Sequence, residues 1–365
     1  MKIRLDSVLV FSCLAVGQAA AADPAAGRQF ERISIHPNGQ EWLVSECART
    51  APDKDDCFIL HYDVASGVLG RYQLPGGYYY RHAAYAPSGH YIVMTRMPQT
   101  AMGATLDEDA LAQAYEAIEI AVMEADGSDF HVLPLARGYK LTPVISPDNS
   151  KLAFWRGAPR PQGSKTVVHQ HELREANLNG REEHPFAGEY GFFGVGQTQY
   201  LDGGTLLFNA SYPSKDAEFS TASESFESRQ AYEKRYGTSQ VYRIARGQRG
   251  AIHPQLAALP RASHATADAK GNWFLTAELP GISAVRRAPD GGTAQWPWPA
   301  NLPATATLSA TAAPDGSKIF FIYMFASELG MNGRAIGQLD TTSGQWRAFD
   351  FPSWRDGIAL PIRLR

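Results

Sequence analysis

The sequence has few cysteines, little net charge and no long apolar run beyond its N-terminal region. Three cysteines and a formal charge of −3 in 365 residues leave no basic excess, so nucleic acid is not an expected partner. No later segment has the roughly 20 consecutive apolar residues of a transmembrane helix. The Gly-x-Ser-x-Gly and His-Glu-x-x-His motifs of common hydrolases are also missing. The sequence therefore favours a binding protein over an enzyme and calls for no cofactor.

The composition is that of a folded chain with many turns. Hydrophobic residues make up 44% and charged residues 19%, which permits a sizeable core and excludes global disorder. The 33 glycines and 23 prolines exceed the usual share slightly. We therefore expect short elements joined by tight turns.

The N-terminus has the pattern of a secretory signal peptide. Lys2 and Arg4 precede an apolar run over residues 8–16, and residues 20–22 are alanines suited to cleavage. We expect residues 1–22 to be removed, which predicts a soluble periplasmic chain of residues 23–365. A lipoprotein signal that uses Cys13 is the alternative, although Phe11 fits that motif poorly.

Two cysteines remain in the exported chain. Cys47 and Cys57 are separated by nine residues, mostly polar and including a proline. An oxidising compartment favours a disulfide between them. The alternative is two buried thiols, and a metal site is weakly indicated because no paired histidine motif accompanies them.

Six repeats of a turn followed by an apolar run organise the chain. The turn residues are Gly39, Gly89, Asn149, Gly203, Gly271 and Gly316. A second turn follows in each repeat, at Gly67, Gly127, Gly180, Gly247, Gly291 and Gly344. Each repeat is therefore expected to form four short antiparallel strands, A to D, with the first turn between A and B and the second between C and D.

Four strands repeated six times predict an all-β fold, a single six-bladed β-propeller domain with four antiparallel strands per blade. The expected blades are residues 30–74, 82–135, 142–186, 194–256, 264–299 and 307–351. The tail, residues 352–365, follows blade 6. Its apolar residues Ile358, Leu360, Ile362 and Leu364 alternate, which predicts a half-buried edge strand against blade 1 or the rim, limited by Pro361.

Length variation is concentrated in the B–C connections. Residues 97–117 form an insertion in blade 2 and residues 212–239 one in blade 4. Residues 226–236 and 106–123 could each form a short helix that covers the channel mouth, binds a partner or packs on its own blade. B–C and D–A connections leave a meander on the same face, so we expect that face to carry function.

Two repeats carry a family resemblance. Residues 146–154, Ser-Pro-Asp-Asn-Ser-Lys-Leu-Ala-Phe, and residues 313–321, Ala-Pro-Asp-Gly-Ser-Lys-Ile-Phe-Phe, resemble the WD40-like (PD40) repeat of TolB-like propellers. The resemblance spans about residues 30–351, and blades 4 and 5 lack the proline. It implies a periplasmic propeller that binds a protein or another ligand.

The D–A loops are rich in aromatic and basic residues. If these loops converge at one channel mouth, they predict a surface for peptides, sugars or partner side chains. The candidate ligand-binding residues are Tyr79, Arg81, His82, Tyr139, Tyr190, Phe193, His264, Trp298 and Arg355. The alternative interpretation is packing between blades.

Histidines raise a second hypothesis, a carbohydrate-active enzyme. His82 and His264 begin A strands, and Arg81, Lys140, Glu189 and Arg261 lie in equivalent loops. Such a set could hold an anionic sugar or a metal, as in the propeller lyases that split oligogalacturonate, although the expected histidine cluster is not matched. His169 and His171 share one side of a strand but lack a third ligand, so a solvated face is favoured over metal.

The first hypothesis is thus a non-catalytic periplasmic propeller that binds a protein or peptide on its D–A/B–C face. The alternative is the lyase-like enzyme at the channel mouth.

Overall fold

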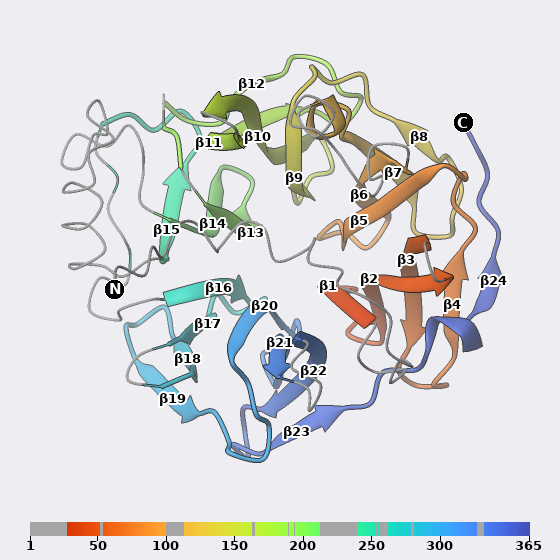
Figure 1. Cartoon of the computed structure of the whole chain (residues 1–365). Helices are drawn as coiled ribbons and strands as arrows, with labels where there is room; N and C mark the ends of the chain where they lie inside the picture. The colour runs from red at the N-terminus through yellow and green to blue at the C-terminus, as the bar shows by residue number, and fades with distance from the viewer. Residues whose placement is uncertain are drawn as a thin grey trace, which may run out of the picture.

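The computed structural model describes residues 28–51, 54–99, 113–162, 165–188, 190–192, 194–211, 239–250, 252, 255, 262–278, 281–326 and 332–365. Within these residues, six antiparallel sheets surround a common centre, with one strand of each sheet innermost (Figure 1). The chain is an all-β six-bladed propeller, as the repeats predict.

The first three blades have their four antiparallel strands in the order A to D. Blade 1 contains β1 (Arg28–Ile35), β2 (Glu41–Ala51), β3 (Lys54–Asp63) and β4 (Leu69–Tyr72). Blade 2 contains β5 (Tyr78–Tyr85), β6 (Tyr91–Pro98), β7 (Glu119–Glu124) and β8 (His131–Val132). Blade 3 contains β9 (Tyr139–Ile145), β10 (Lys151–Gln162), β11 (Lys165–Asn177) and β12 (His184–Pro185).

The other three blades follow the same order. Blade 4 contains β13 (Val195–Asp202), β14 (Thr205–Ala210) and β15 (Gln240–Ala245). Blade 5 contains β16 (Ala262–Ala267), β17 (Trp273–Ala277), β18 (Ser283–Arg287) and β19 (Thr293–Pro297). Blade 6 contains β20 (Ala306–Ala312), β21 (Lys318–Ala326), β22 (Asn332–Asp340) and β23 (Trp346–Phe349). The expected fourth strand of blade 4 lies largely outside the described residues.

The predicted turns are where the sequence places them. All six C–D turn glycines have positive φ, from 69° at Gly67 to 90° at Gly291. Among the A–B turns, Asn149 adopts φ 58° in place of glycine, since asparagine tolerates the left-handed region. Gly203 is the exception, because its φ is not positive.

Two A strands begin earlier than expected. The expected blades 2 and 3 begin at residues 82 and 142, but β5 and β9 start at Tyr78 and Tyr139. Tyr78 pairs with Pro98 and Tyr139 pairs with Gly157, so the neighbouring B strands are long enough to extend the ladder. Aromatic residues favour such half-buried strand positions.

The core lies between blades rather than within one sheet. Between blades 3 and 4, the fully buried Trp155 meets Phe192 and Phe208 with ring centroids 5.5 and 5.0 Å apart. Comparable clusters join the other blades, each built from inward residues of neighbouring sheets. Large residues at these seams fix the blades around the axis.

The predicted disulfide is present. Cys47 of β2 faces Cys57 of β3 across the hairpin, with Cα atoms 4.0 Å apart. It lies in the B–C hairpin of blade 1, on the same face as the D–A connections.

The ring closes without a shared sheet between blades 1 and 6. Phe30 packs against Phe351 with ring centroids 5.9 Å apart, and Arg334 of β22 donates to the Phe30 carbonyl at 3.0 Å. Thr311 Oγ1 donates to the carbonyl of Ile33 at 2.7 Å. Side chains therefore join the first and last blades.

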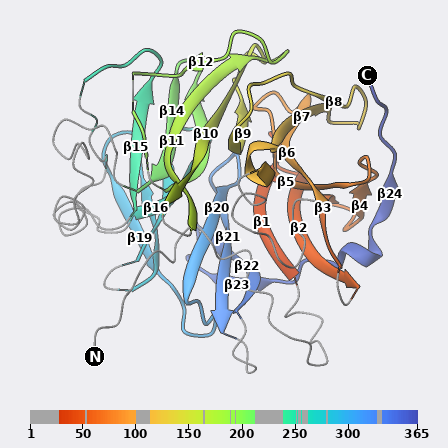
Figure 2. The ribbon, with the colours of Figure 1, turned by 45° about the horizontal axis from the view of Figure 1, so that its top comes forward.

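The tail reinforces this closure from outside. After a short 3-10 helix, η3 (Trp354–Asp356), strand β24 (Ile358–Leu360) pairs in parallel with β4, and Leu364 bridges to Phe130 of blade 2. Figure 2 shows β24 beside β4 at the edge of the molecule. The tail thus packs against blade 1, as predicted.

The predicted alternation of the tail is only partly right. Leu360 and Ile362 pack on the core between blades 1 and 2, whereas Ile358 and Leu364 are 56% and 68% exposed. Strand β24 ends before Pro361, which has no N–H to donate.

Several sequence predictions fall outside the described residues: the signal peptide at 1–22, residues 100–112 of the blade 2 insertion and residues 212–238 of the blade 4 insertion. In the described part of the chain, no helix is long and apolar enough to cross a membrane.

Candidate functional site: an axial cavity on the turn face

A bulge recurs in every A strand at the level where the channel narrows. The register of each A–B pair shifts by one residue, for example between Arg81 and Ala84 of β5. Near this bulge lies the seventh residue before each A–B turn: Arg32, His82, Thr142, Gly196, His264 and Ser309. Positive φ values of 55°, 42° and 53° at His82, Thr142 and His264 show the local strain.

The side chains at this level bond across blades. Arg32 Nη1 of blade 1 donates to the carbonyls of His82 and Pro143, at 3.1 and 3.2 Å, in blades 2 and 3. Ser309 Oγ of blade 6 donates to Gln197 Oε1 of blade 4 at 3.0 Å. These contacts form the floor of the cavity described next.

A cavity of about 790 Å³ occupies the axis between this floor and the A–B turns. All six blades line it through the C-terminal halves of their A strands, such as residues 32–35, 84–86 and 311–312. Its rim includes the turn prolines Pro37, Pro87, Pro147 and Pro314. The cavity therefore opens on the turn face, opposite to the D–A/B–C face.

The charges that line the cavity are mostly positive. Arg32 lies at the floor, and Arg243, Lys270 and Arg287 lie towards blades 4 and 5. Asp268 is the one acidic residue in the lining, and its carboxylate accepts from the Lys270 and Asn272 amides, both at 2.9 Å. A chain with overall charge −3 thus has a positively charged cavity.

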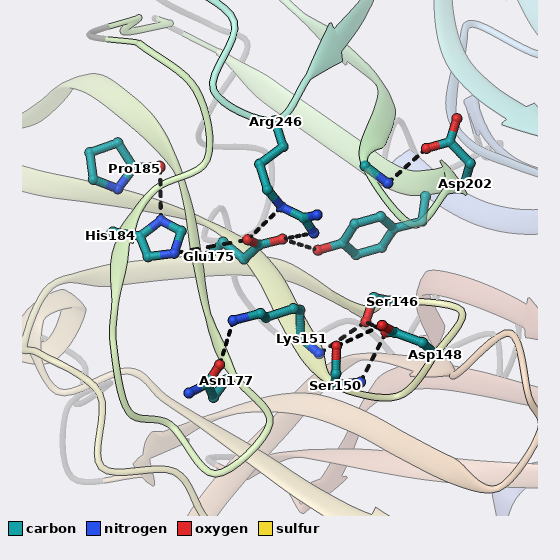
Figure 3. Close-up of polar contacts among 12 residues, drawn as sticks. Ser146, Asp148, Ser150, Lys151, Glu175, Asn177, His184, Pro185, Asp202 and Arg246 are labelled. Atoms are coloured by element: carbon teal, nitrogen blue, oxygen red, sulfur yellow. Dashed lines mark hydrogen bonds and ion pairs between the residues drawn. The ribbon is translucent and has the colours of Figure 1, made fainter.

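An ion pair joins blades 3 and 4, with its carboxylate buried and its guanidinium 39% exposed (Figure 3). Glu175 of β11 is fully buried and accepts from Arg246 Nη2 at 2.6 Å. The Tyr200 hydroxyl, whose residue also lines the cavity, donates to the same carboxylate at 2.9 Å. His184 approaches it to 4.0 Å.

The predicted residues Arg81 and His82 lie together near the middle of β5. Arg81 Nε is 2.6 Å from Glu31 Oε2. Burial alone would raise the pKa of Glu31, but the guanidinium of Arg81 outweighs it and lowers that pKa. Burial lowers the pKa of His82 to about 3, and its Nδ1 lies 3.2 Å from Thr95 Oγ1. Both predicted side chains are thus engaged within the protein.

Lys140 is buried and His264 is half-buried. Lys140 Nζ donates to the carbonyls of Ile118 and Gly138 at 2.9 and 3.2 Å, and burial lowers its pKa to about 8. His264 Nε2 lies 2.9 Å from the carbonyl of Thr307, while burial lowers its pKa to about 4. Each side chain is held by backbone of its own or a neighbouring blade.

Three predicted aromatic residues pack between elements. Tyr190 is 8% exposed within the blade 3–4 core, and its hydroxyl donates to the Gly250 carbonyl at 2.6 Å. Trp298 lies 4.7 Å from the Trp346 ring, and its Nε1 donates to the Leu302 carbonyl at 2.6 Å. Tyr139 lies 4.7 Å from the Tyr115 ring. Each of these three rings is therefore engaged in local packing.

The remaining candidates are dispersed. Tyr79 lies in β5 opposite Met97, and Arg355 lies in η3 over the ring of Trp354, 4.9 Å from its centroid. Phe193, Glu189 and Arg261 lie outside the described residues, as does the side chain of His169. His171 is buried against the Phe192 carbonyl. In the described residues, no three His, Cys, Asp or Glu side chains are grouped to hold a metal.

No protein-family model and no curated protein sequence matches this chain. Solved propellers match its fold at low identity. The β-propeller domain of the Trilobed protease from Pyrococcus furiosus, described as having an open velcro topology, matches with a TM-score of 0.52 and 11% identity over 92% of this chain and 98% of that one. The tricorn protease matches with a TM-score of 0.52 and 13% identity, covering 90% of this chain and 26% of that one.

TolB from Acinetobacter baumannii matches with a TM-score of 0.44 and 15% identity, covering 83% of this chain and 67% of that one. The chain thus spans about a quarter of the tricorn protease. At these identities the comparisons establish the fold alone, a six-bladed β-propeller like those of the Trilobed and tricorn proteases.

Proposed function

We propose that this chain is an exported, periplasmic, non-catalytic propeller that binds a protein or peptide segment in its axial cavity. The main observation that supports this proposal is the cavity of about 790 Å³, which opens on the turn face and is lined by all six blades. Concave sites of several hundred Å³ with mixed apolar and polar walls are typical of ligand binding.

The proposal places the binding face opposite to the one expected from the loop lengths. On the D–A side, the described groups near the axis are engaged with one another, as in the pair of Arg81 with Glu31. On the turn side, a cavity of about 790 Å³ has Arg32 in its lining. Available volume therefore favours the turn face.

The test uses a substitution that blocks the cavity mouth and leaves the core residues unchanged. Ala269 lies at the rim with its side chain exposed, so Ala269→Trp should obstruct entry while the fold remains intact. Ala359→Trp, on exposed strand β24, is a matched control. The probe is a pool of random pentapeptides with N-terminal fluorescein, and binding is followed by polarisation.

We expect Ala269→Trp to reduce pool binding at least about tenfold, which corresponds to about 1.4 kcal/mol, while Ala359→Trp binds like the native chain. Retained binding in Ala269→Trp together with loss in Tyr79→Ala would instead locate the site on the D–A face.

A further inference from the structure

Arg32 is a buried cation at the floor of the axial cavity. The residue is only 5% exposed, yet it is part of the cavity lining. A buried arginine normally has a carboxylate partner, because transferring an isolated charge out of water costs several kcal/mol. The question is what balances this charge.

The hydrogen bonds of Arg32 leave one edge of its guanidinium without a partner. Both bonds, to the carbonyls of His82 and Pro143, leave from Nη1. Nε is buried and has no hydrogen-bond partner in the described part of the protein. The Nε and Nη2 groups are the edge that can pair two N–H donors with one carboxylate.

The neighbouring carboxylate does not neutralise Arg32. Glu31, the next residue in β1, is committed to Arg81, whose Nε lies 2.6 Å from its Oε2. Burial lowers the pKa of Arg32 to about 10, and no acidic side chain opposes that shift. The guanidinium is therefore still charged at neutral pH, and its charge is unbalanced within the described residues.

A peptide end can reach Arg32 from the turn face. From Pro37 at the rim to Arg32 at the floor, β1 spans five residue steps, or roughly 16 Å at 3.3 Å per residue. About five residues of an extended peptide span the same depth. The lining also extends outward to Arg243 of β15 and Arg287 of β18.

We propose that the cavity admits an extended peptide end-on and that Arg32 binds the peptide's C-terminal carboxylate at the floor. This inference rests on the proposed binding function and specifies the ligand. The cations along the wall, Arg243, Lys270 and Arg287, attract the incoming negative charge. A terminus carries its carboxylate at the end of the chain and reaches the floor first, which favours it over an internal acidic side chain.

The experiment compares two pools of N-terminally labelled random pentapeptides, one with a free C-terminal carboxylate and one with a C-terminal amide. Each protein variant is titrated with both pools, and the measured quantity is the ratio of their affinities. Because the ratio is taken within one variant, partial loss of folded protein cancels.

The native chain should prefer the free-acid pool by about 10- to 100-fold, the strength of a charge-assisted hydrogen-bonded pair. In Arg32→Gln the ratio should fall to near one, and Arg32→Lys should keep part of the preference through its charge. Arg347→Gln, an exposed arginine outside the cavity lining, is the matched control and should keep the native ratio.

Equal affinity of the native chain for both pools would overturn the carboxylate assignment, and so would an unchanged ratio in Arg32→Gln. If both pools bind equally and Ala269→Trp abolishes that binding, the cavity is the site but Arg32 does not select a terminus. If Ala269→Trp leaves binding unchanged, the proposed function itself fails.

Discussion

Polar groups near the A-strand bulge differ in how their charges are balanced. Arg81 pairs with Glu31, and His82 is neutral with its Nδ1 3.2 Å from Thr95 Oγ1; we call this set the closed end of the channel. Arg32 occupies the equivalent position of β1 in the lining of the cavity, which we call the open end, and its buried Nε has no hydrogen-bond partner in the described residues. Paired polar groups stabilise a fold, whereas an unbalanced charge in a cavity lining is suited to binding. The comparison therefore separates structural groups from a functional one.

The largest effect should come from the buried histidine of the closed end. The pKa of His82 is lowered to about 3 by burial, whereas an unfolded histidine titrates near 6.5. The unfolded state therefore binds more protons below about pH 6.5, and stability falls as the pH falls towards 3. Asparagine tolerates the φ of 55° at position 82, so His82→Asn is a suitable variant. Between pH 6.5 and 4.5, its free energy of unfolding should fall by about 2–3 kcal/mol less than that of the native chain.

Urea denaturation at several pH values measures this difference directly. Parallel pH profiles for the native chain and His82→Asn would show that His82 is protonated in the folded state, against the account of the closed end.

A similar test removes the ion pair at the same end. Glu31→Gln removes the charge of a carboxylate that is 6% exposed and paired with Arg81, so the free energy of unfolding should fall by about 2–3 kcal/mol. Glu119→Gln is the matched control, because Glu119 is 41% exposed and its pair with Arg96 should contribute under about 1 kcal/mol. Chemical denaturation that shows equal losses for both would mean that the closed end is not specially stabilised.

The disulfide on that face should contribute comparably. The disulfide between Cys47 and Cys57 lowers the conformational entropy of the unfolded chain, which stabilises the folded state by about 2–3 kcal/mol. Cys47→Ser with Cys57→Ser should therefore lower the free energy of unfolding by that amount and leave peptide binding at the turn face unchanged. A parallel loss of peptide affinity in the folded variant would show that the two faces are coupled.

The smallest stability effect should come from the open end. Arg32→Met removes two hydrogen bonds to carbonyls but also an unbalanced buried charge, and these contributions oppose each other. We expect the free energy of unfolding to change by under about 1 kcal/mol while the preference for free-acid over amidated peptides is lost. A loss above about 3 kcal/mol by denaturation would instead make Arg32 a structural residue.

The sequence predicts the fold because turns carry local signals. Gly67 and Gly316 need the left-handed backbone that their turns adopt, so such positions mark the blade periodicity. Cys47 and Cys57 were likewise predictable, since a hairpin brings them opposite each other.

The site was harder to predict because it depends on register and not on composition. Arg32, His82 and Ser309 occupy equivalent places near the A-strand bulge but share no chemistry, so no repeat pattern marks them. The count of seven residues back from each turn would have aligned them. Aromatic loop residues such as Trp298 resemble a binding surface in sequence, but burial in a seam between blades is visible only in three dimensions.

The most direct measurement is photocrosslinking with the free-acid pentapeptide pool that carries a benzophenone at its N-terminus. With the C-terminal carboxylate on Arg32, the label must lie near the rim, roughly 16 Å away. The account predicts adducts, mapped by mass spectrometry, on rim residues such as Pro37, Ala269 and Pro314. Adducts on Tyr79 and the D–A connections, with none at the rim, would contradict it.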